Sequence, residues 1–258
     1  MPITVVRGAS ISWSETGSGS TVLCAHGMTS SRANESARLD WTDVATSGHR
    51  LVAFDARGHG LSSGGSRPDD YEWSALAEDL IELIRRIAPG ERVAGIGVSM
   101  GTATLIYAAL RAPKLFSHLI LAAIPTAWAT REAQIQSYLL MADLVEKQGI
   151  DALIESLRSR PIPSSFAGLE SVEYSPDVKE HLLPSILRGA ALSDLPEASI
   201  IAQLKIPVLI LAWTDDPGHP VSSAKKLHEL IQGSHISIAE SLNQIGAWGK
   251  LAAEFLET

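Results

Sequence analysis

Short apolar runs and helical patterns alternate along the first half of the chain. Leucine and isoleucine recur at helical spacing from residue 73 to residue 87, which is typical of an amphipathic helix. Apolar runs of strand length predict a starting hairpin and four buried strands, at residues 3–14, 21–25, 51–54, 92–98 and 119–124. Strands that alternate with helices indicate a parallel sheet with helices on both faces.

This alternation stops between residues 126 and 202, where only helical patterns occur. It resumes with an apolar run at 206–213, followed by two helical patterns and one further short strand. We therefore predict an α/β fold with a mostly parallel central sheet of about eight strands and helices on both faces. Residues 1–125 and 203–258 form the predicted core domain, and residues 126–202 a helical cap inserted after the sixth strand.

The charge and composition of the chain exclude some classes of binding partner. The chain has 258 residues and a formal net charge of −8 without a long basic run, so neither nucleic acid nor an anionic membrane is an expected partner. No signal-peptide pattern and no apolar run of membrane-span length occurs, so we expect a cytoplasmic protein. Cys24 is the only cysteine, which excludes a disulfide within the chain.

Cofactor and metal motifs are also absent from the sequence. No His, Cys or Asp cluster has metal-ligand spacing, and no glycine-rich dinucleotide motif opens an early helix. We therefore expect a small-molecule substrate, no cofactor and no metal. The oligomeric state is left open.

A glycine-rich turn around Ser99 carries the strongest chemical signal. An apolar run enters Gly97-Val-Ser99-Met-Gly101, and an alanine-rich helical pattern follows it. A serine at such a strand-to-helix turn is exposed above the sheet, and the glycines provide the room and the dihedral angles that the turn needs. The N-terminus of the helix presents amide N–H groups to a developing oxyanion. This stretch therefore predicts a nucleophile elbow with Ser99 as the nucleophile.

Four motifs occur in one order along the chain. They are His26-Gly27 after a strand, the loop at 55–62, the Ser99 elbow, and Asp-Asp-Pro-Gly-His-Pro at 215–220 after an apolar run. Their order and spacing resemble the α/β-hydrolase superfamily, in the branch of small esterases, lactonases and haloperoxidase-like proteins. The resemblance implies that the backbone N–H groups of Met28 and Met100 form the oxyanion hole, and that the cap lies where the helical segment falls.

The resemblance also indicates where the acid of a catalytic triad lies. It favours Asp216, directly before a proline, over the neighbouring Asp215. The base is where this sequence departs from the family pattern. The family places a histidine just after the last strand, but Asn243 and Gln244 stand at that position here.

Three explanations for the missing late histidine stay open. In the explanation we prefer, the base is His219, which follows Asp216 by three residues and reaches the serine from the same loop. Alternatively, His235 in the last strand is the base, or no histidine acts and the protein is slow, non-hydrolytic or a binder. His26 and His59 fit turn-forming positions of their loops, where we expect structural roles.

These residues predict a cofactor-independent serine hydrolase that acts on a carboxylic ester or lactone. The apolar cap predicts a hydrophobic acyl or ring group on the substrate. Trp128 and Trp213 are candidate walls of the substrate pocket, although core packing is an equal explanation for Trp213. The alternative is a non-hydrolytic member of the same fold, a small-molecule binder or a lyase or cyclase.

Overall fold

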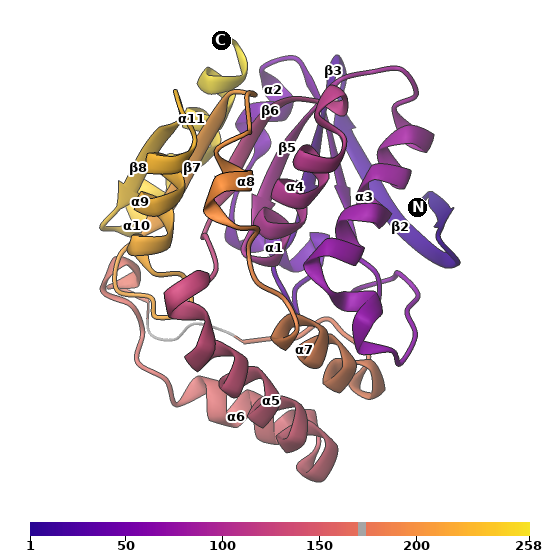
Figure 1. The fold of residues 1–258 in the computed structure, drawn as a ribbon, viewed down its shortest axis with the longest axis vertical. Helices are drawn as coiled ribbons and strands as arrows, with labels where there is room; N and C mark the ends of the chain where they lie inside the picture. The colour runs from indigo at the N-terminus through magenta and orange to yellow at the C-terminus, as the bar shows by residue number, and fades with distance from the viewer. Residues whose placement is uncertain (170–173) are drawn as a thin grey trace.

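An eight-stranded sheet forms the centre of the molecule (Figure 1). The computed structural model describes residues 1–169 and 174–258. Within this part of the chain the strands follow the order β1-β2-β4-β3-β5-β6-β7-β8. Their bounds are β1 Ile3–Val6, β2 Ala9–Gly17, β3 Ser20–Ala25, β4 His49–Phe54, β5 Val93–Val98, β6 Phe116–Ala122, β7 Val208–Trp213 and β8 His235–Ala239.

Most of the sheet is parallel, as the sequence predicts. The hairpin strands β1 and β2 pair antiparallel, and β2 also pairs antiparallel with β4. All other neighbouring strands run parallel, from β4 through β3, β5, β6 and β7 to β8. Every residue of β5 and β7 is buried, which explains their continuous apolar sequences. The carboxyl ends of the parallel strands meet at one edge, where ligands bind in open α/β sheets.

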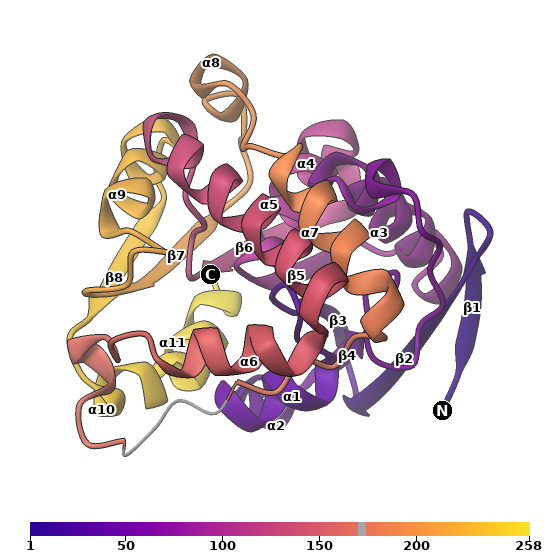
Figure 2. The same ribbon diagram turned by 90° about the horizontal axis from the view of Figure 1, so that it is seen from below.

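Helices cover both faces of the sheet, so the predicted fold class is confirmed. One face packs against α3 (Trp73–Ile87), α4 (Met100–Arg111) and α9 (Val221–Leu230). The other packs against α2 (Thr42–Thr46), α10 (Leu242–Gly246) and α11 (Trp248–Leu256). Figure 2 shows these two layers with the strands between them. Each layer buries its own apolar cluster against the sheet.

The helix α1 (Arg32–Arg38) has no counterpart among the elements predicted from the sequence. Its sequence, Arg-Ala-Asn-Glu-Ser-Ala-Arg, lacks an apolar stripe, and it buries no residue. A cap stabilises it instead, because the Ser31 hydroxyl accepts a hydrogen bond from the Asn34 amide at 3.2 Å. This polar helix matters for the site because it carries Glu35.

The segment between β6 and β7 holds the remaining α-helices of the described residues. They are α5 (Arg131–Gln148), α6 (Ile150–Arg158), α7 (Leu183–Ala191) and α8 (Ala198–Ile201). The segment is not purely helical, because Val178 forms an isolated antiparallel bridge with His59. Its insertion after the sixth strand agrees with the prediction. Figure 1 shows α5, α6 and α7 together beyond one edge of the sheet.

Three contacts identify that edge as the one where the parallel strands end. Thr29, after β3, and Tyr174 share a hydrogen bond between their hydroxyl groups at 3.0 Å. His59, after β4, pairs with Val178, and the Ser165 hydroxyl donates to the carbonyl of Thr214, directly after β7, at 3.0 Å. The inserted segment therefore lies against the loops that extend the carboxyl ends of the strands. Within the described ranges, no helix combines the length and the apolar character that a membrane span requires.

Candidate active site

Ser99 occupies the sharp turn between β5 and α4. Its backbone has φ 53° and ψ −110°, a region that residues with a side chain rarely adopt. The Ser99 amide donates to the Ala122 carbonyl at 3.1 Å, which ties the turn to the end of β6. Such a conformation costs on the order of 1–3 kcal/mol and persists only where the surroundings hold it in place.

The two glycines of the elbow are required by close packing. A Cβ on Gly101 would lie 2.0 Å from the Ala25 carbonyl oxygen, and a Cβ on Gly97 would lie 2.6 Å from the Gly101 carbonyl carbon. Real Cβ atoms do not approach so closely, so α4 can pack this tightly on β3 and β5 only without these side chains. The Thr102 hydroxyl closes the turn by donating to the Gly97 carbonyl at 2.8 Å.

A continuous chain of hydrogen bonds joins Ser99, His219 and Asp216. His219 Nε2 lies 2.8 Å from Ser99 Oγ, and His219 Nδ1 lies 2.7 Å from Asp216 Oδ2. An ionised carboxylate only accepts hydrogen bonds, so Nδ1 carries a proton and donates to Asp216. In the neutral ring Nε2 is then free to accept the proton of the Ser99 hydroxyl. This is the arrangement needed to activate a serine nucleophile.

The Asp216 carboxylate accepts hydrogen bonds from three donors among the described residues. Oδ2 accepts from His219 Nδ1 and from the indole N–H of Trp213, the latter at 2.9 Å, and Oδ1 accepts from the Gly218 amide at 2.8 Å. Burial by itself raises the pKa of Asp216, but the hydrogen bond and charge of His219 and the other two donors outweigh it and bring the pKa below the ordinary value. Asp216 is therefore ionised at neutral pH.

The alternative candidates for acid and base lie elsewhere. The Asp215 carboxylate accepts a hydrogen bond from the Ser164 hydroxyl. His235 is exposed at the start of β8, opposite Leu209 near the start of β7. In a parallel pair this is the edge away from the carboxyl ends, so His235 cannot reach Ser99. Gln244 lies in α10, where its side chain accepts from the Glu240 amide.

The two residues predicted to form the oxyanion hole flank Ser99. Met100 is the first residue of α4, and Met28 follows Gly27 in the turn after β3. A Cβ on Gly27 would lie 3.6 Å from the Cβ of Ser99, so this turn packs directly against the elbow. The Met28 side chain contacts both the core and the apolar cluster of α5 to α7. That Met28 and Met100 amides bind an oxyanion stays a prediction.

The two tryptophans predicted as pocket walls are both held by hydrogen bonds of the indole N–H. Trp128 lies at the start of the inserted segment, where its indole donates to the Pro196 carbonyl at 3.0 Å and its amide to the Asp194 carboxylate. Trp213 is 9% exposed and its indole donates to Asp216. Trp213 is thus a hydrogen-bond partner of Asp216, which the sequence did not indicate. Contact of either ring with substrate stays a prediction.

Unusual backbone conformations gather at this edge of the sheet. Among the described residues other than glycine, positive φ angles occur in the loops after β3, β5, β6 and β7, at Thr29, Ser99, Ala123, Trp128 and Asp215. Arg7 in the first hairpin is the sixth case. Strained backbone clusters at functional sites because the surrounding structure holds it there. The strain thus falls on the same loops as the hydrogen-bonded chain from Ser99 to Asp216.

Glu35 is a neighbour of the site that sequence reasoning missed. Its Oε2 accepts a hydrogen bond from the Gly27 amide at 3.0 Å, beside the elbow. Burial raises the pKa of this carboxyl, while the Gly27 bond and the charges of Arg38 and His219 oppose that shift. No sequence signal pointed to it, because it belongs to the polar helix α1.

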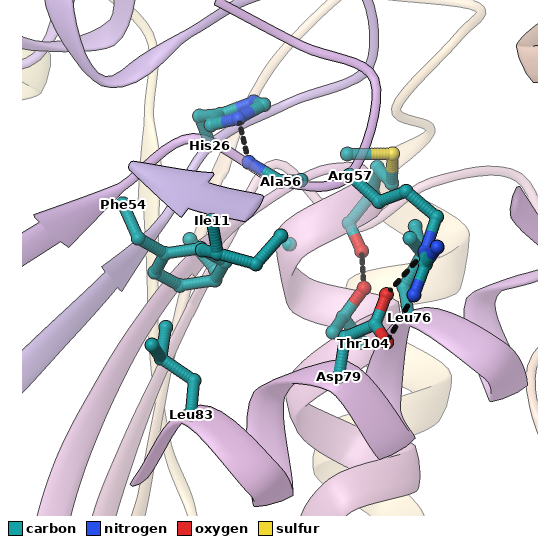
Figure 3. Close-up of a pocket in the computed structure, with 12 residues that line it drawn as sticks. Ile11, His26, Phe54, Ala56, Arg57, Leu76, Asp79, Leu83 and Thr104 are labelled. Carbon is teal, nitrogen blue, oxygen red and sulfur yellow. Dashed lines mark hydrogen bonds and ion pairs between the residues drawn. The ribbon is translucent and has the colours of Figure 1, made fainter. Parts of the chain in front are cut away.

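His26 and the loop after β4 have structural roles, as expected. His26 Nε2 accepts from the Ala56 amide at 2.9 Å, and Nδ1 lies 2.8 Å from the Gly27 carbonyl oxygen. The Arg57 guanidinium forms two bonds to the Asp79 carboxylate, at 2.7 and 2.8 Å. Figure 3 shows both interactions beside a cavity between the sheet and α3 and α4. The cavity measures about 20 Å³, room for about one water molecule and too small for an ester.

A larger hollow, of about 400 Å³, lies between the sheet and helices α1 and α2. Its floor includes Cys24, whose pKa is raised to about 12 by burial and by the charge of Glu35. The thiol is therefore not ionised at neutral pH and is a poor nucleophile. Neither hollow is lined by Ser99, so neither encloses the reacting atoms. In residues 1–169 and 174–258, no group of three or more His, Cys, Asp or Glu side chains is placed to hold a metal ion.

Comparison with known proteins identifies the family. The chain belongs to the α/β-hydrolase fold family, whose model matches residues 20–180, more than half of the chain. A curated relative, 3-oxoadipate enol-lactonase 2 of Acinetobacter baylyi, is 28% identical over 200 residues, covering 74% of this chain and 70% of that protein.

Solved structures share the whole fold. The enol-lactonase of Burkholderia xenovorans superposes with a TM-score of 0.80 at 17% identity, over 100% of both chains. An esterase of Exiguobacterium antarcticum superposes with a TM-score of 0.77 at 19% identity, over 99% of each chain. At these identities the likeness concerns the fold.

Proposed function

We propose that this protein is a cofactor-independent serine hydrolase that cleaves a carboxylic ester or lactone. The observation that carries the proposal is the hydrogen-bonded chain from Ser99 through His219 to Asp216, with 2.8 Å and 2.7 Å between the bonded atoms. The names of the relatives, enol-lactonase and esterase, support ester and lactone chemistry.

The first half of the reaction forms an acyl-enzyme. His219 Nε2 takes the proton of the Ser99 hydroxyl as Oγ attacks the carbonyl carbon of the substrate. The negative charge moves to the carbonyl oxygen, where the amides of Met28 and Met100 stabilise it. His219 then gives its proton to the departing alkoxide as the carbon–oxygen bond breaks. Asp216 stays ionised and stabilises the imidazolium that forms in between.

The second half returns the enzyme to its starting state. His219, neutral again, takes a proton from water while the water oxygen attacks the acyl carbon. The tetrahedral intermediate collapses, and Ser99 Oγ leaves with the proton held by His219. The products are a carboxylic acid and an alcohol, or one hydroxy acid if the substrate is a lactone.

The inserted segment at residues 126–202 is assigned as a cap over this site. Its helices α5, α6 and α7 lie beyond the edge of the sheet that carries Ser99 (Figure 1). An apolar cluster joins them to Met28, next to the elbow. The hydrophobic lining of this interface supports a substrate with an apolar acyl or ring group. Trp128, where the segment begins, is a candidate pocket wall.

The main reason to consider a non-hydrolytic function no longer holds. That hypothesis depended on the absence of a histidine after the last strand. His219 now supplies an imidazole within hydrogen-bond distance of Ser99 Oγ. No other feature of the described residues favours a binder or a lyase, so hydrolysis is the function that the site supports best.

The test is hydrolysis of nitrophenyl esters and simple lactones by purified protein. We expect turnover by the wild-type protein and none above background by Ser99→Ala. Short-chain, long-chain and aromatic acyl groups compared at equal concentration measure the preference for apolar substrates. A folded wild-type protein that hydrolyses no ester or lactone, or a Ser99→Ala variant with full activity, would overturn the proposal.

A further inference from the structure

We propose that Trp213 is a positioning residue of the hydrolase, and that its indole N–H holds the acid Asp216 in the orientation that receives His219. The inference rests on the proposed function of Ser99, His219 and Asp216. It gives Trp213 a role different from that of a pocket wall. The chemical basis is a single carboxylate oxygen that accepts from two rings.

That shared oxygen is Asp216 Oδ2. It lies 2.7 Å from His219 Nδ1 and 2.9 Å from Trp213 Nε1. The indole nitrogen is a donor only and keeps its proton at every relevant pH, so the bond to Trp213 persists whether or not His219 is charged. Because the Gly218 amide donates to the other oxygen at 2.8 Å, both ends of the carboxylate are fixed.

The Trp213 ring is itself held by three neighbours. It stacks on Trp248 of α11 with ring centroids 5.6 Å apart and an interplanar angle of 10°. The rings of Phe166, from the inserted segment, and of His219 stand nearly perpendicular to it, with ring centroids 5.1 Å and 5.7 Å from its own. A ring confined by the core, the inserted segment and the base cannot turn without breaking these contacts. The indole N–H is therefore a fixed reference point for Asp216.

The shared oxygen has a consequence for proton transfer. A donor that withdraws charge from Oδ2 weakens the stabilisation that Asp216 gives to protonated His219. Removal of the indole N–H therefore makes the imidazolium more stable, and a higher pH is needed to free Nε2 as a base. Among the described residues, the ionisable groups related to this loop include Glu35 on α1, whose charge interacts with His219, and Asp215, whose carboxylate accepts from the Ser164 hydroxyl. Phe166 and Trp248, which pack on the ring, carry no charge.

Trp213→Phe removes the N–H and keeps an aromatic ring, and Trp248→Phe is the matched control. Trp248 belongs to the same stack, but among the described residues its buried indole nitrogen has no hydrogen-bond partner, and Asp216 accepts from Trp213 instead, so the loss of the Trp248 indole removes no bond to Asp216. For Trp213→Phe we expect kcat to fall about tenfold with KM within about twofold, because misplaced catalytic groups slow the chemical step. We also expect the acid limb of the pH profile of kcat/KM, where activity falls as the pH is lowered, to move to a higher pH by about half a unit. Trp248→Phe leaves the limb in place.

A second measurement uses the unaltered protein and does not need turnover. In ¹⁵N–¹H spectra recorded over a series of pH values, we expect the indole signal of Trp213 to shift with the same midpoint pH as the signals of the His219 ring. The indole signal of Trp248 is expected to stay unchanged over that series. If the wild-type protein hydrolyses no ester, the proposed function fails, but this titration still tests the bond. The positioning role is overturned if the Trp213 signal does not respond, or if the two variants show the same kcat and the same acid limb.

Discussion

His219 Nε2 lies 2.8 Å from Ser99 Oγ, although 120 positions separate the two residues in the chain. The fold brings them together because β5 and β7 both end at the same edge of the sheet, with β6 between them. His219 is three residues from Asp216, so the proposed acid and base come from one loop after β7. The loop after β8, where the family pattern places the base, is not needed for this contact.

Asp216→Asn is expected to reduce kcat by about four orders of magnitude while the protein stays folded. An amide that donates to His219 favours the wrong tautomer of the imidazole, and the effect of the equivalent change in a serine protease has that size. Asp215→Asn is the control, because Asp215 bonds to Ser164 rather than to the imidazole. Ester turnover at neutral pH measures both. Equal losses in the two variants would contradict the assignment of the acid.

Gly101→Ala is expected to destabilise the protein by about 3 kcal/mol or to prevent folding, since overpacking a tight interior forces the backbone to move. The added Cβ would lie 2.0 Å from the Ala25 carbonyl oxygen. Gly246→Ala in α10 is the control, because apart from its chain neighbours and its own helix backbone no described atom lies within 4 Å of the added Cβ. Urea unfolding compares the two. A Gly101→Ala protein as stable as Gly246→Ala would show that the elbow does not need its glycine.

Asp79→Asn is expected to cost about 3 kcal/mol of stability, because the Arg57 guanidinium then stays buried without its negatively charged partner. Both side chains of this pair are less than 10% exposed. Glu82→Gln on the same helix is the control, since its pair with Arg86 is at the surface and such pairs contribute about 0.5 kcal/mol. Thermal or urea unfolding measures the difference. Similar effects of the two changes would contradict a structural role for the buried pair.

The stability of the protein is expected to fall as the pH falls from 6.5 to 5. Burial lowers the pKa of His26 to about 4 and that of His59 to about 3, with a further lowering of His59 by the charge of His26. Both values lie below the ordinary 6.5, so the unfolded chain binds protons that the folded protein does not. The free energy of unfolding then declines by up to about 1.4 kcal/mol per pH unit for each ring. Urea unfolding at several pH values measures the slope, and a constant stability over this interval would contradict it.

The sheet and its main helices were predictable because each has a strong local signal. The fully apolar β5 and β7, and the amphipathic α3, fall within about two residues of their predicted positions. The helix α1 was not predictable, since it has no apolar stripe and is held by the Ser31 cap and by contacts of its polar side chains with distant residues such as Asp55. The bridge at Val178 depends on a contact with a distant loop, which no local pattern records.

The candidate site was predictable in part. The glycines around Ser99 and the proline after Asp216 are local signals, so both residues could be named from the sequence. The preference for His219 rested on its distance along the chain from Asp216, and only the fold shows that His235 lies at the opposite edge of the sheet. The bonds of Trp213 to Asp216 and of Glu35 to Gly27 arise from three-dimensional packing alone.

The most direct test of the central claim is the labelling of Ser99 by a fluorophosphonate, read by peptide mass spectrometry in three proteins. In the wild-type protein we expect the adduct on Ser99 alone. In His219→Ala we expect the labelling rate to fall by about three orders of magnitude or more, because the serine has lost its base. In His235→Ala we expect the wild-type rate. Labelling that survives in His219→Ala and is lost in His235→Ala would contradict the account.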